Sequence, residues 1–566
     1  MSNKQRIKGA EALLLSLIAE GTETIFGYPG GQAIPIYDAL YDHRDKLTHI
    51  LTRHEQGAAH AAQGYARVTG KPGVCLVTSG PGATNLVTGI ADAMLDSTPM
   101  VCITGQVPAS LLGTDAFQEA DIISITMPIT KWNFQVTKAS EISQAIAKAF
   151  YIARTGRPGP VLIDITKDAQ VEEFDFAYKP CIYLRSYNPK PELDAEAIKK
   201  AVDMINAAEK PLLLVGQGIK LAGAEKELLE FAEAANVPVA QTLMGISAVP
   251  NNHPLFIGNL GMHGTIAANA MTQESDLIVA VGMRFSDRVT GDIKEYAPKA
   301  QIIQIDIDAA ELGKNIAIAL PVNADAKEAL EAMKAGIQHK ERKPWFGSIK
   351  AHHDKEHEEV VLAGTDPDGK CITMSDVIRT LAEAEKGDAV IVTDVGQNQM
   401  FSAKYSKFNS TRSFITSGGL GTMGFGLPAG MGAKIGAPDR EVVAIMGDGG
   451  FQMTMQELGT IMQNRVGLKM IVLNNNFLGM VRQWQQLFFD RRYSFTEIDN
   501  PDFAMIARAY GIEAETVADP KDLKAAIKRM ADAKGAYFLE VTVAREQNVF
   551  PMVPAGASLS NMICKE

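Results

Sequence analysis

The chain has 566 residues, which is too long for a single hydrophobic core and corresponds to about three or four domains. Hydrophobic residues make up 46% and charged residues 21%, as in ordinary soluble globular proteins, and the net charge of −11 argues against a nucleic-acid partner. No apolar stretch approaches the ~20 residues of a membrane-spanning helix, so we expect no membrane partner either.

The five cysteines have no CxxC spacing, which favours a reducing compartment and buried thiols. The first residues lead directly into an amphipathic helix and do not have the pattern of a signal peptide. Both features predict a cytoplasmic protein.

Residues 1–178 form a first block in which apolar runs alternate with helical stretches, a pattern typical of an α/β fold. Its expected strands include residues 73–78, 100–104 and 161–165. Glu55, in the segment Arg53-His54-Glu55, enters a helix rich in Ala and Gly. A single glutamate at a helix start more often stabilises the helix dipole than takes part in catalysis, so Glu55 needs further support.

A second α/β block follows a proline-containing linker at residues 179–194, with expected strands at 211–215, 277–281 and 302–307. A second linker is expected at residues 339–369. Its histidines could suggest a metal site, but a charged surface helix is the favoured interpretation.

Two features of the second block are compatible with a nucleotide, although neither is specific. Gly216-Gln217-Gly218 follows an expected strand, but Leu221 leaves the GxGxxG pattern incomplete. Asp306 and Asp308 stand near the end of a later strand, where they could contact a ribose but are also common. Composition alone does not indicate a flavin.

The third block, residues 370–545, carries the most specific signal. Two apolar runs, 442–446 and 468–473, end in Asp448 and Asn475, and residues 451–464 between them have the spacing of a helix. A strand–helix–strand unit of this length predicts a parallel pair, with both polar residues at the carboxyl edge of the sheet. Hard oxygen ligands beside glycines predict a site for Mg²⁺ and a diphosphate. Strand, glycine turn and helix also recur in the first block, a hint of duplicated architecture.

Residues 478–489 begin just after Asn475, and a helix there would place Met480, Trp484 and Phe488 on one face. A plain amphipathic helix is the default interpretation of such spacing. The position next to the metal ligand favours a face that adjoins the cofactor.

GDG followed some two dozen residues later by NN matches the thiamine-diphosphate signature, and further segments spread over nearly the whole chain resemble the biosynthetic large subunits of the acetohydroxyacid synthase (acetolactate synthase) family. These segments are Tyr28-Pro29-Gly30-Gly31, Ser79-Gly80-Pro81-Gly82-Ala83-Thr84-Asn85, Ala116-Phe117-Gln118-Glu119, Arg157-Pro158-Gly159-Pro160-Val161, Gly419-Leu420-Gly421-Thr422-Met423-Gly424 and Pro551-Met552-Val553-Pro554-Ala555-Gly556-Ala557.

This resemblance implies three doubly wound parallel-sheet domains of the thiamine-diphosphate enzyme type. They are a pyrimidine-binding domain (1–178), a central FAD-binding domain (192–338) and a diphosphate- and Mg²⁺-binding domain (370–545), followed by a C-terminal arm (546–566). The active site is expected between the first block of one subunit and the third block of another, in a homodimer or a dimer of dimers. A small regulatory subunit is a further partner that the family suggests.

The resemblance also implies roles for individual residues. Mg²⁺ is expected on Asp448, Asn475 and the backbone of Phe477. The residues expected to act in catalysis are Glu55, which activates the cofactor, Met423, which bends it, and Gln118 and Lys167 along the substrate channel. The substrate is expected to contact Gly31, Phe117, Gln118, Arg288, Met480 and Trp484.

Two cofactor sets complete the expectation. Thiamine diphosphate is expected on Tyr28, Pro29, Gly30, Gly31, Pro81, Asn85, Gly396, Gln397, Asn398, Gln399, Gly421, Met423, Gly447, Asp448, Gly449, Gly450, Asn475, Leu478, Gly479 and Met480. FAD is expected on Gly216, Gln217, Gly218, Thr242, Leu243, Met244, Gly261, Met262, His263, Gly264, Arg284, Asp306, Ile307 and Asp325. Two positions depart from the family: Ser286 replaces an aspartate, and Asn398 replaces the histidine of GQHQ, which puts a pH response there in doubt.

The implied reaction decarboxylates pyruvate on thiamine diphosphate and transfers the hydroxyethyl carbanion to pyruvate or 2-oxobutanoate, giving 2-acetolactate or 2-aceto-2-hydroxybutanoate for branched-chain amino acid synthesis. The alternatives are a catabolic, flavin-free acetolactate synthase and pyruvate oxidase. Glyoxylate carboligase is disfavoured because that relative has no glutamate at the position of Glu55. Glu55, Asp448 and Asn475 also disfavour a non-catalytic scaffold.

Overall fold

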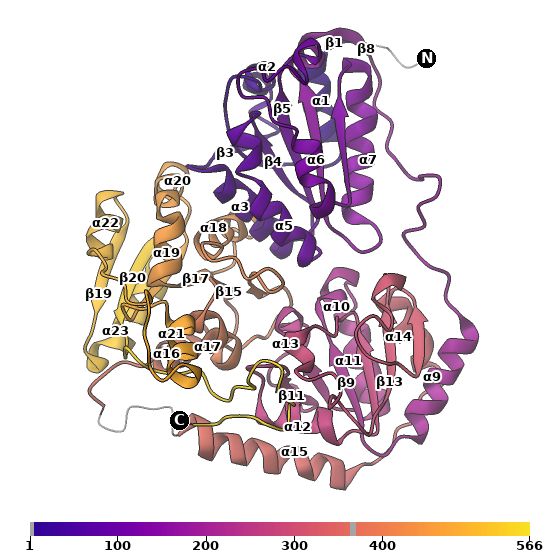
Figure 1. Ribbon diagram of the computed structural model, residues 1–566, viewed down its shortest axis with the longest axis vertical. Helices are drawn as coiled ribbons and strands as arrows, with labels where there is room; N and C mark the ends of the chain where they lie inside the picture. The colour runs from indigo at the N-terminus through magenta and orange to yellow at the C-terminus, as the bar shows by residue number, and fades with distance from the viewer. Residues whose placement is uncertain (1–4, 363–368, 566) are drawn as a thin grey trace.

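The computed structural model describes residues 5–362 and 369–565, and it contains three six-stranded parallel sheets (Figure 1). Each sheet is buried on both faces. In the third sheet, for example, Ala444 and Met446 pack into one core, whereas Val443 and Ile445 pack into another. The expected fold class, three doubly wound α/β units, is confirmed. The domain boundaries themselves stay a prediction.

The first sheet has the strand order β3-β2-β4-β5-β7-β6. Its strands are β2 (Thr24–Tyr28), β3 (Thr48–Leu51), β4 (Gly73–Val77), β5 (Met100–Gln106), β6 (Trp132–Val136) and β7 (Pro160–Thr166). The helices are α1 (Gly9–Ala19), α2 (Ile34–Leu40), α3 (Glu55–Thr69), α4 (Pro81–Thr84), α5 (Val87–Leu95), α6 (Ile122–Thr126), α7 (Ile142–Arg154) and α8 (Lys167–Val171). A short antiparallel pair, β1 (Gln5–Lys8) with β8 (Glu173–Phe176), flanks this sheet.

The central sheet has the order β11-β10-β9-β12-β13-β14, which is 3-2-1-4-5-6 when its strands are numbered along the chain. This is the order of dinucleotide-binding sheets, which bind ligands where the order reverses, here between β9 and β12. The strands are β9 (Pro211–Val215), β10 (Val239–Gln241), β11 (Phe256–Asn259), β12 (Leu277–Val281), β13 (Gln301–Asp306) and β14 (Leu320–Asn323). The helices are α9 (Ala195–Ala207), α10 (Gln217–Ala222), α11 (Glu225–Ala235), α12 (Ile266–Glu274), α13 (Asp287–Thr290), α14 (Ala326–Lys334) and α15 (Lys343–Glu356).

The third sheet has the order β16-β15-β17-β18-β20-β19. Numbered along the chain, this order and that of the first sheet are both 2-1-3-4-6-5, so the hinted duplication of architecture is confirmed. The strands are β15 (Val390–Thr393), β16 (Phe414–Ile415), β17 (Val442–Gly447), β18 (Lys469–Asn474), β19 (Glu513–Val517) and β20 (Tyr537–Thr542). The helices are α16 (Met374–Glu385), α17 (Gln397–Tyr405), α18 (Gly426–Gly436), α19 (Asp448–Thr454), α20 (Leu458–Asn464), α21 (Gly479–Phe488), α22 (Phe503–Ala509) and α23 (Pro520–Asp532).

The single helix expected at residues 451–464 is wrong in two respects. The first helical segment, α19, already begins at Asp448, and a 3₁₀ turn separates it from α20. Thr454 causes the break, because its backbone leaves the helical region (φ −137°) while its hydroxyl donates to the carbonyl of Gly424 at 3.0 Å.

The expected surface helix in the second linker is confirmed as α15, which packs on α12 along the lower edge of Figure 1. His352 pairs there with Glu274 (Nε2 to Oε1, 3.3 Å). None of the helices in residues 5–362 and 369–565 combines the length and the apolar character that a membrane crossing needs.

Helices α3 and α18 join the first block to the third (Figure 1). Glycines let their backbones approach unusually closely. A Cβ atom at Gly64 would lie 1.9 Å from the carbonyl oxygen of Ala429, and one at Gly432 would lie 1.8 Å from that of Ala61. Neither position can therefore carry a side chain without separating the helices.

Residues 546–565 form an extended segment that runs from the third block to the central block (Figure 1). Val553 and Leu559 are buried in the central core, and the N–H of Val553 donates to the carbonyl of Met262 at 2.8 Å. The C-terminal arm therefore packs over the central block.

The α3–α18 contact leads to a stability prediction. Gly432→Ala should lower the thermal midpoint, because overpacking against a backbone carbonyl costs about 1–3 kcal/mol. Gly347→Ala is the matched control, since nothing lies within 4 Å of its Cβ position in the helix α15. This control should stabilise by about 0.5–1 kcal/mol. Thermal scans at one fixed rate would contradict the packing argument if both variants melted alike.

Candidate active site

Asp448 and Asn475 lie at the carboxyl ends of neighbouring parallel strands, as predicted. β17 and β18 are paired in register, and Asp448 starts the helix that follows β17. Its Oδ2 accepts a hydrogen bond from the N–H of Asn476 at 2.8 Å, which joins the two strand ends. The amide of Asn475 donates to the carbonyl of Arg545 at 3.3 Å.

The environment of Asp448 fits a cation. Its buried carboxylate accepts hydrogen bonds from the N–H of Gly449 (2.9 Å) and from Asn500 Nδ2 (2.8 Å) but makes no ion pair with any described residue. Burial raises the pKa of Asp448 to about 6. A divalent cation would supply the missing positive charge, and carboxylate, amide and carbonyl oxygens are the ligands that Mg²⁺ prefers. The buried backbone of Phe477 follows two residues after Asn475.

Glycines with close neighbours surround this point. A Cβ atom at Gly449 would lie 2.7 Å from Leu478 Cδ2, and one at Gly479 would lie 2.3 Å from Gln397 Oε1. The predicted diphosphate segments 396–399, 447–450 and 478–479 therefore converge on one region. Bare backbone of this kind lets N–H groups approach phosphate oxygens.

Met423 lies on the loop between β16 and α18, next to the same turn. A Cβ atom at Gly449 would lie 3.7 Å from Met423 Cε. Asp394 holds this loop, because its buried carboxylate accepts hydrogen bonds from the N–H groups of Gly424 (3.0 Å) and Gly426 (2.9 Å). The sequence analysis missed Asp394, although its place at the end of the strand β15 is the signal that could have found it.

Glu55 begins α3 in the first block. Asn85, also predicted to contact the cofactor, donates to Glu55 Oε2 at 3.0 Å. Gly82 faces the other oxygen, because a Cβ atom there would lie 3.5 Å from Glu55 Oε1. One carboxylate oxygen is thus fixed by Asn85, and the other lies close to Gly82.

The remaining predicted residues of the first block gather at the carboxyl edge of its sheet. Lys167 Nζ donates to the carbonyl of Gly31 at 3.3 Å. Gln118 has a left-handed backbone (φ 60°) that packs against Gly80. Phe117 is 84% exposed. Tyr28, Pro29, Gly30 and Pro81 follow β2 and β4 at the same edge.

The predicted catalytic and metal residues form two groups within one chain. No hydrogen bond or ion pair among the described residues joins Glu55, Gln118 or Lys167 to Asp448 or Asn475. One group belongs to the first sheet, and the other belongs to the third.

Glu457 nevertheless anchors the start of α3 to the third block. Its buried carboxylate accepts hydrogen bonds from the N–H groups of Arg53 (3.0 Å) and His54 (3.1 Å) and from the hydroxyl of Thr460 (2.6 Å). Sequence reasoning missed this residue, because a contact across some four hundred positions leaves no local signal.

A cavity of about 1270 Å³ lies between the central and third blocks and reaches the first. All the predicted flavin residues line it except Gly261 and Gly264. The same wall includes Gly396, Gln399 and Gly421 of the predicted thiamine site, and Arg288, Met480 and Trp484 of the predicted substrate site. The structure therefore brings residues expected for three ligands to one continuous space.

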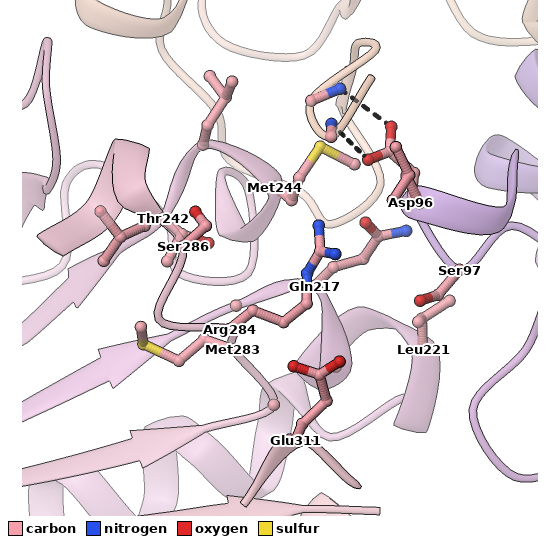
Figure 2. Close-up of a pocket in the computed structure, with 18 of the residues that line it drawn as sticks. Asp96, Ser97, Gln217, Leu221, Thr242, Met244, Met283, Arg284, Ser286 and Glu311 are labelled. Atoms are coloured by element: carbon pink, nitrogen blue, oxygen red, sulfur yellow. Dashed lines mark hydrogen bonds between the residues drawn. The ribbon is translucent and has the colours of Figure 1, made fainter. Parts of the chain in front are cut away.

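Several features of this cavity fit a flavin nucleotide. It lies at the reversal point of the central sheet, where Gly216 and Gly218 pack so closely on Gly282 that a Cβ atom at either would come within 2.5 Å of it. Arg284 points into the cavity and makes no hydrogen bond or ion pair with a described residue (Figure 2). Burial lowers the pKa of His263 to about 4, and its Nδ1 has no partner within the described chain.

The helix α21 differs from a plain amphipathic helix packed on a core, so that default interpretation is wrong. Met480 and Trp484 line the cavity, and the Trp484 ring lies 5.1 Å from that of the half-exposed Phe488. The buried face is polar instead. Arg482 donates to the carbonyls of Glu546 and Gln547, and Gln483 donates to that of Val549 at 3.1 Å. The C-terminal arm thus provides hydrogen-bond acceptors for a polar helix face that local periodicity would place in solvent.

The two departures from the family pattern lie at informative places. Ser286 lines the cavity close to Arg288. Asn398 lies beside Gly447, where its Nδ2 donates to the carbonyl of Val395 at 3.3 Å and its Oδ1 is buried without a partner in the described chain. A neutral amide at this position does not titrate near neutral pH.

Three family models match the chain. They are the N-terminal TPP-binding domain of thiamine pyrophosphate enzymes (residues 7–125), the central domain (198–333) and the C-terminal TPP-binding domain (394–541). Among similar curated proteins, the "Acetolactate synthase large subunit" of Corynebacterium glutamicum is 47% identical over 99% of this chain and 90% of its own length. The "Probable acetolactate synthase large subunit" of Methanocaldococcus jannaschii is 46% identical over 98% and 95%. The "Acetolactate synthase isozyme 2 large subunit" of Escherichia coli K12 is 44% identical over 99% and 100%.

The carboxylate of Asp306, at the edge of the cavity, leads to a pH prediction. Burial raises its pKa to about 6, while Glu311 close by has a lowered pKa and stays charged. Its charge therefore opposes folding above pH 6, and this cost disappears as the pH falls. If the charged form accepts ribose hydroxyls, the Kd for FAD should rise about fourfold from pH 7.5 to 5.5. Flavin fluorescence titrations should show a flat profile for Asp306→Asn, and a wild-type slope in that variant would refute the assignment.

Proposed function

Since the chain belongs to the thiamine-diphosphate-dependent acetolactate synthase family, we propose that it is an acetohydroxyacid synthase catalytic subunit acting on pyruvate and 2-oxobutanoate. The observation that carries this proposal is the single cavity in which predicted flavin residues meet Arg288, Met480 and Trp484. The products are 2-acetolactate and 2-aceto-2-hydroxybutanoate, the precursors of branched-chain amino acids.

The chain provides a place for each cofactor. Asp448, Asn475 and the carbonyl of Phe477 would hold Mg²⁺, and the segments 396–399 and 447–450 would hold the diphosphate. When bound, thiamine diphosphate supplies the electron sink that lets pyruvate lose CO₂ and pass its other two carbons to a second 2-oxoacid. FAD, held in the central block, has a structural role in this family.

Glu55 is the proposed activating carboxylate. Asn85 fixes Oε2, so that Oε1 can share a proton with the pyrimidine ring of the cofactor. Met423 would support the bound cofactor, and Asp394 holds the loop on which Met423 lies.

Arg288 and Trp484 are the proposed recognition residues for the second substrate. A guanidinium fork is complementary to a planar carboxylate, and Arg288 is 62% exposed at its side chain, paired only with the adjacent Asp287 (3.1 Å) among the described residues. Trp484 provides an apolar wall for the extra methyl group of 2-oxobutanoate, and burying one such carbon contributes about 0.8 kcal/mol.

The flavin residues also bear on the alternatives. A cavity lined by nearly the whole predicted flavin set disfavours the flavin-free catabolic synthase. Pyruvate oxidase would use the flavin as an oxidant, and it would release acetate or acetyl phosphate. The names of the relatives, which are acetolactate synthase large subunits, favour the biosynthetic synthase over both alternatives.

We further propose that the active unit is a homodimer or a dimer of dimers, located in the cytoplasm. No hydrogen bond or ion pair among the described residues joins Glu55 to Asp448 within one chain, which supports a site completed by the first block of a second subunit. Relatives bear the name "large subunit", and on this ground we propose that a small regulatory subunit binds this chain too.

Substrate preference is tested by competition. With thiamine diphosphate, Mg²⁺ and FAD present, pyruvate and 2-oxobutanoate are supplied together and both acetohydroxyacids are quantified. The wild type should form mainly 2-aceto-2-hydroxybutanoate, and Trp484→Leu should lower the product ratio about fourfold. Phe489→Leu, at the exposed end of the same helix, is the control and should keep the ratio. Acetolactate alone, independent of FAD, would indicate the catabolic enzyme, and acetate with reduced flavin would indicate the oxidase.

The role of Glu55 is tested by Glu55→Gln. Loss of the proton-sharing carboxylate should reduce kcat by ~100-fold or more, whereas calorimetric affinity for thiamine diphosphate should change little. Glu23→Gln, which removes only an exposed ion pair with Lys71, is the control and should retain full activity. A Glu55→Gln variant with more than a tenth of the wild-type kcat would rule out this role.

A further inference from the structure

The loop between β16 and α18 meets all three blocks at Gly418 and Gly419. Both backbone N–H groups donate to the carboxylate of Asp96, at 2.9 Å and 2.7 Å, as Figure 2 shows. Asp96 belongs to the first block, where it caps the carboxyl end of α5. One buried carboxylate of the first block therefore holds two consecutive peptide groups of the third.

Asp96 is itself held in place by a buried arginine. Arg67 Nη2 donates to Asp96 Oδ2 at 2.9 Å, and Arg67 Nη1 donates to the carbonyl of Thr416, at the start of the same loop. The neighbouring Asp92 accepts hydrogen bonds from the hydroxyl groups of Ser417 and Thr422, the latter at 3.2 Å. These side chains are all buried, so their hydrogen bonds define the loop position strongly.

The central block packs against the other side of the loop. A Cβ atom at Gly418 would lie 2.3 Å from Met244 Sδ, and one at Gly419 would lie 3.3 Å from Arg284 Nη2 and 2.8 Å from Asp96 Oδ1. Figure 2 shows Met244 and Arg284 below the loop and Asp96 beside it. Met244 and Arg284 both line the flavin cavity.

The loop between β16 and α18 is held at both ends, so a displacement at Gly418 and Gly419 also moves the residues that follow. Gly421 and Met423 follow only a few residues after this contact, and Asp394 holds Gly424 and Gly426 beyond them. A close-packed segment held at both ends transmits displacement rather than absorbing it. The position of Gly418 and Gly419 thus sets the position of Met423.

We propose that Asp96 is a positioning residue that couples flavin binding to thiamine diphosphate binding. A flavin in the cavity orders Met244 and Arg284 against Gly418 and Gly419, Asp96 holds the opposite side, and the loop then presents Gly421 and Met423 to the thiamine cofactor. This inference rests on the proposed function only in the identity of the two cofactors. It gives the flavin an effect on the reaction centre without any transfer of electrons.

The test measures binding rather than turnover. Calorimetry on the full chain gives the Kd of thiamine diphosphate with Mg²⁺, once without flavin and once with saturating FAD. In the wild type, FAD should lower this Kd at least ~5-fold, and thiamine diphosphate should lower the Kd for FAD by the same factor, since coupling is reciprocal. In Asp96→Asn the side-chain NH₂ group would face a hydrogen-bond donor where the carboxylate now accepts. The coupling factor should therefore fall below twofold.

Glu356→Gln is the matched control. Glu356 is also a buried carboxylate that joins two blocks, through Lys404 (2.8 Å) and the N–H of Ile266 (2.8 Å), but it lies away from the loop. It should lose stability and keep the wild-type coupling factor. Thr422→Val, which removes one hydrogen bond to Asp92, is the milder second variant and decides the question if Asp96→Asn does not fold; its coupling factor should be clearly reduced.

A wild-type coupling factor of one would overturn the inference, as would an unchanged factor in the variants. The product assay is separate. Coupled binding without acetohydroxyacid formation would sink the proposed function and leave this inference standing, whereas product formation without coupling would do the reverse.

Discussion

The close contact of α3 and α18 is the constraint on which the rest of the molecule depends. Gly64 and Gly432 allow the two helices to touch backbone to backbone, and this contact fixes the first block on the third. The helix α3 carries Glu55 at its start, where Glu457 holds the preceding peptides. The helix α18 continues the loop of Met423. One contact between small residues thus sets the geometry of both halves of the proposed catalytic machinery.

The three blocks place their predicted ligand-binding residues by one rule of parallel sheets. Side chains at the carboxyl ends of strands meet at a common edge, most openly where the strand order reverses. Tyr28 and Pro81 follow such strands in the first block, Gly216 and Arg284 in the second, and Gly396 and Asp448 in the third. The second block has the order suited to a dinucleotide, whereas the other two share a different order. This difference agrees with one flavin site and a thiamine site divided between two like domains.

The local sequence pattern was sufficient to predict the strands and the GDG…NN unit. A buried parallel strand is a continuous apolar run, and such a run can be recognised without knowledge of its neighbours in the fold. The runs 211–215 and 277–281 are strands over the same residues as predicted. Long-range contacts explain the failures. The break at Thr454 depends on the carbonyl of Gly424, and the buried polar face of α21 depends on carbonyls of the arm. The roles of Asp96, Asp394 and Glu457 were not predicted. The role of a single carboxylate becomes visible only when the peptide N–H groups that it binds in the folded chain are known.

The C-terminal arm has a consequence for the order in which the molecule can assemble. Arg482 and Gln483 are buried against carbonyls of residues 546–549, and Met262, on the cavity wall, receives a hydrogen bond from Val553. These acceptors and donors leave the ribosome after all three sheets. During synthesis the domains can therefore form one by one, from the first onward. The buried polar face of α21, however, gains its carbonyl partners only when the last segment docks, so the helix that carries Met480 and Trp484 of the cavity wall reaches its final environment at the end of translation.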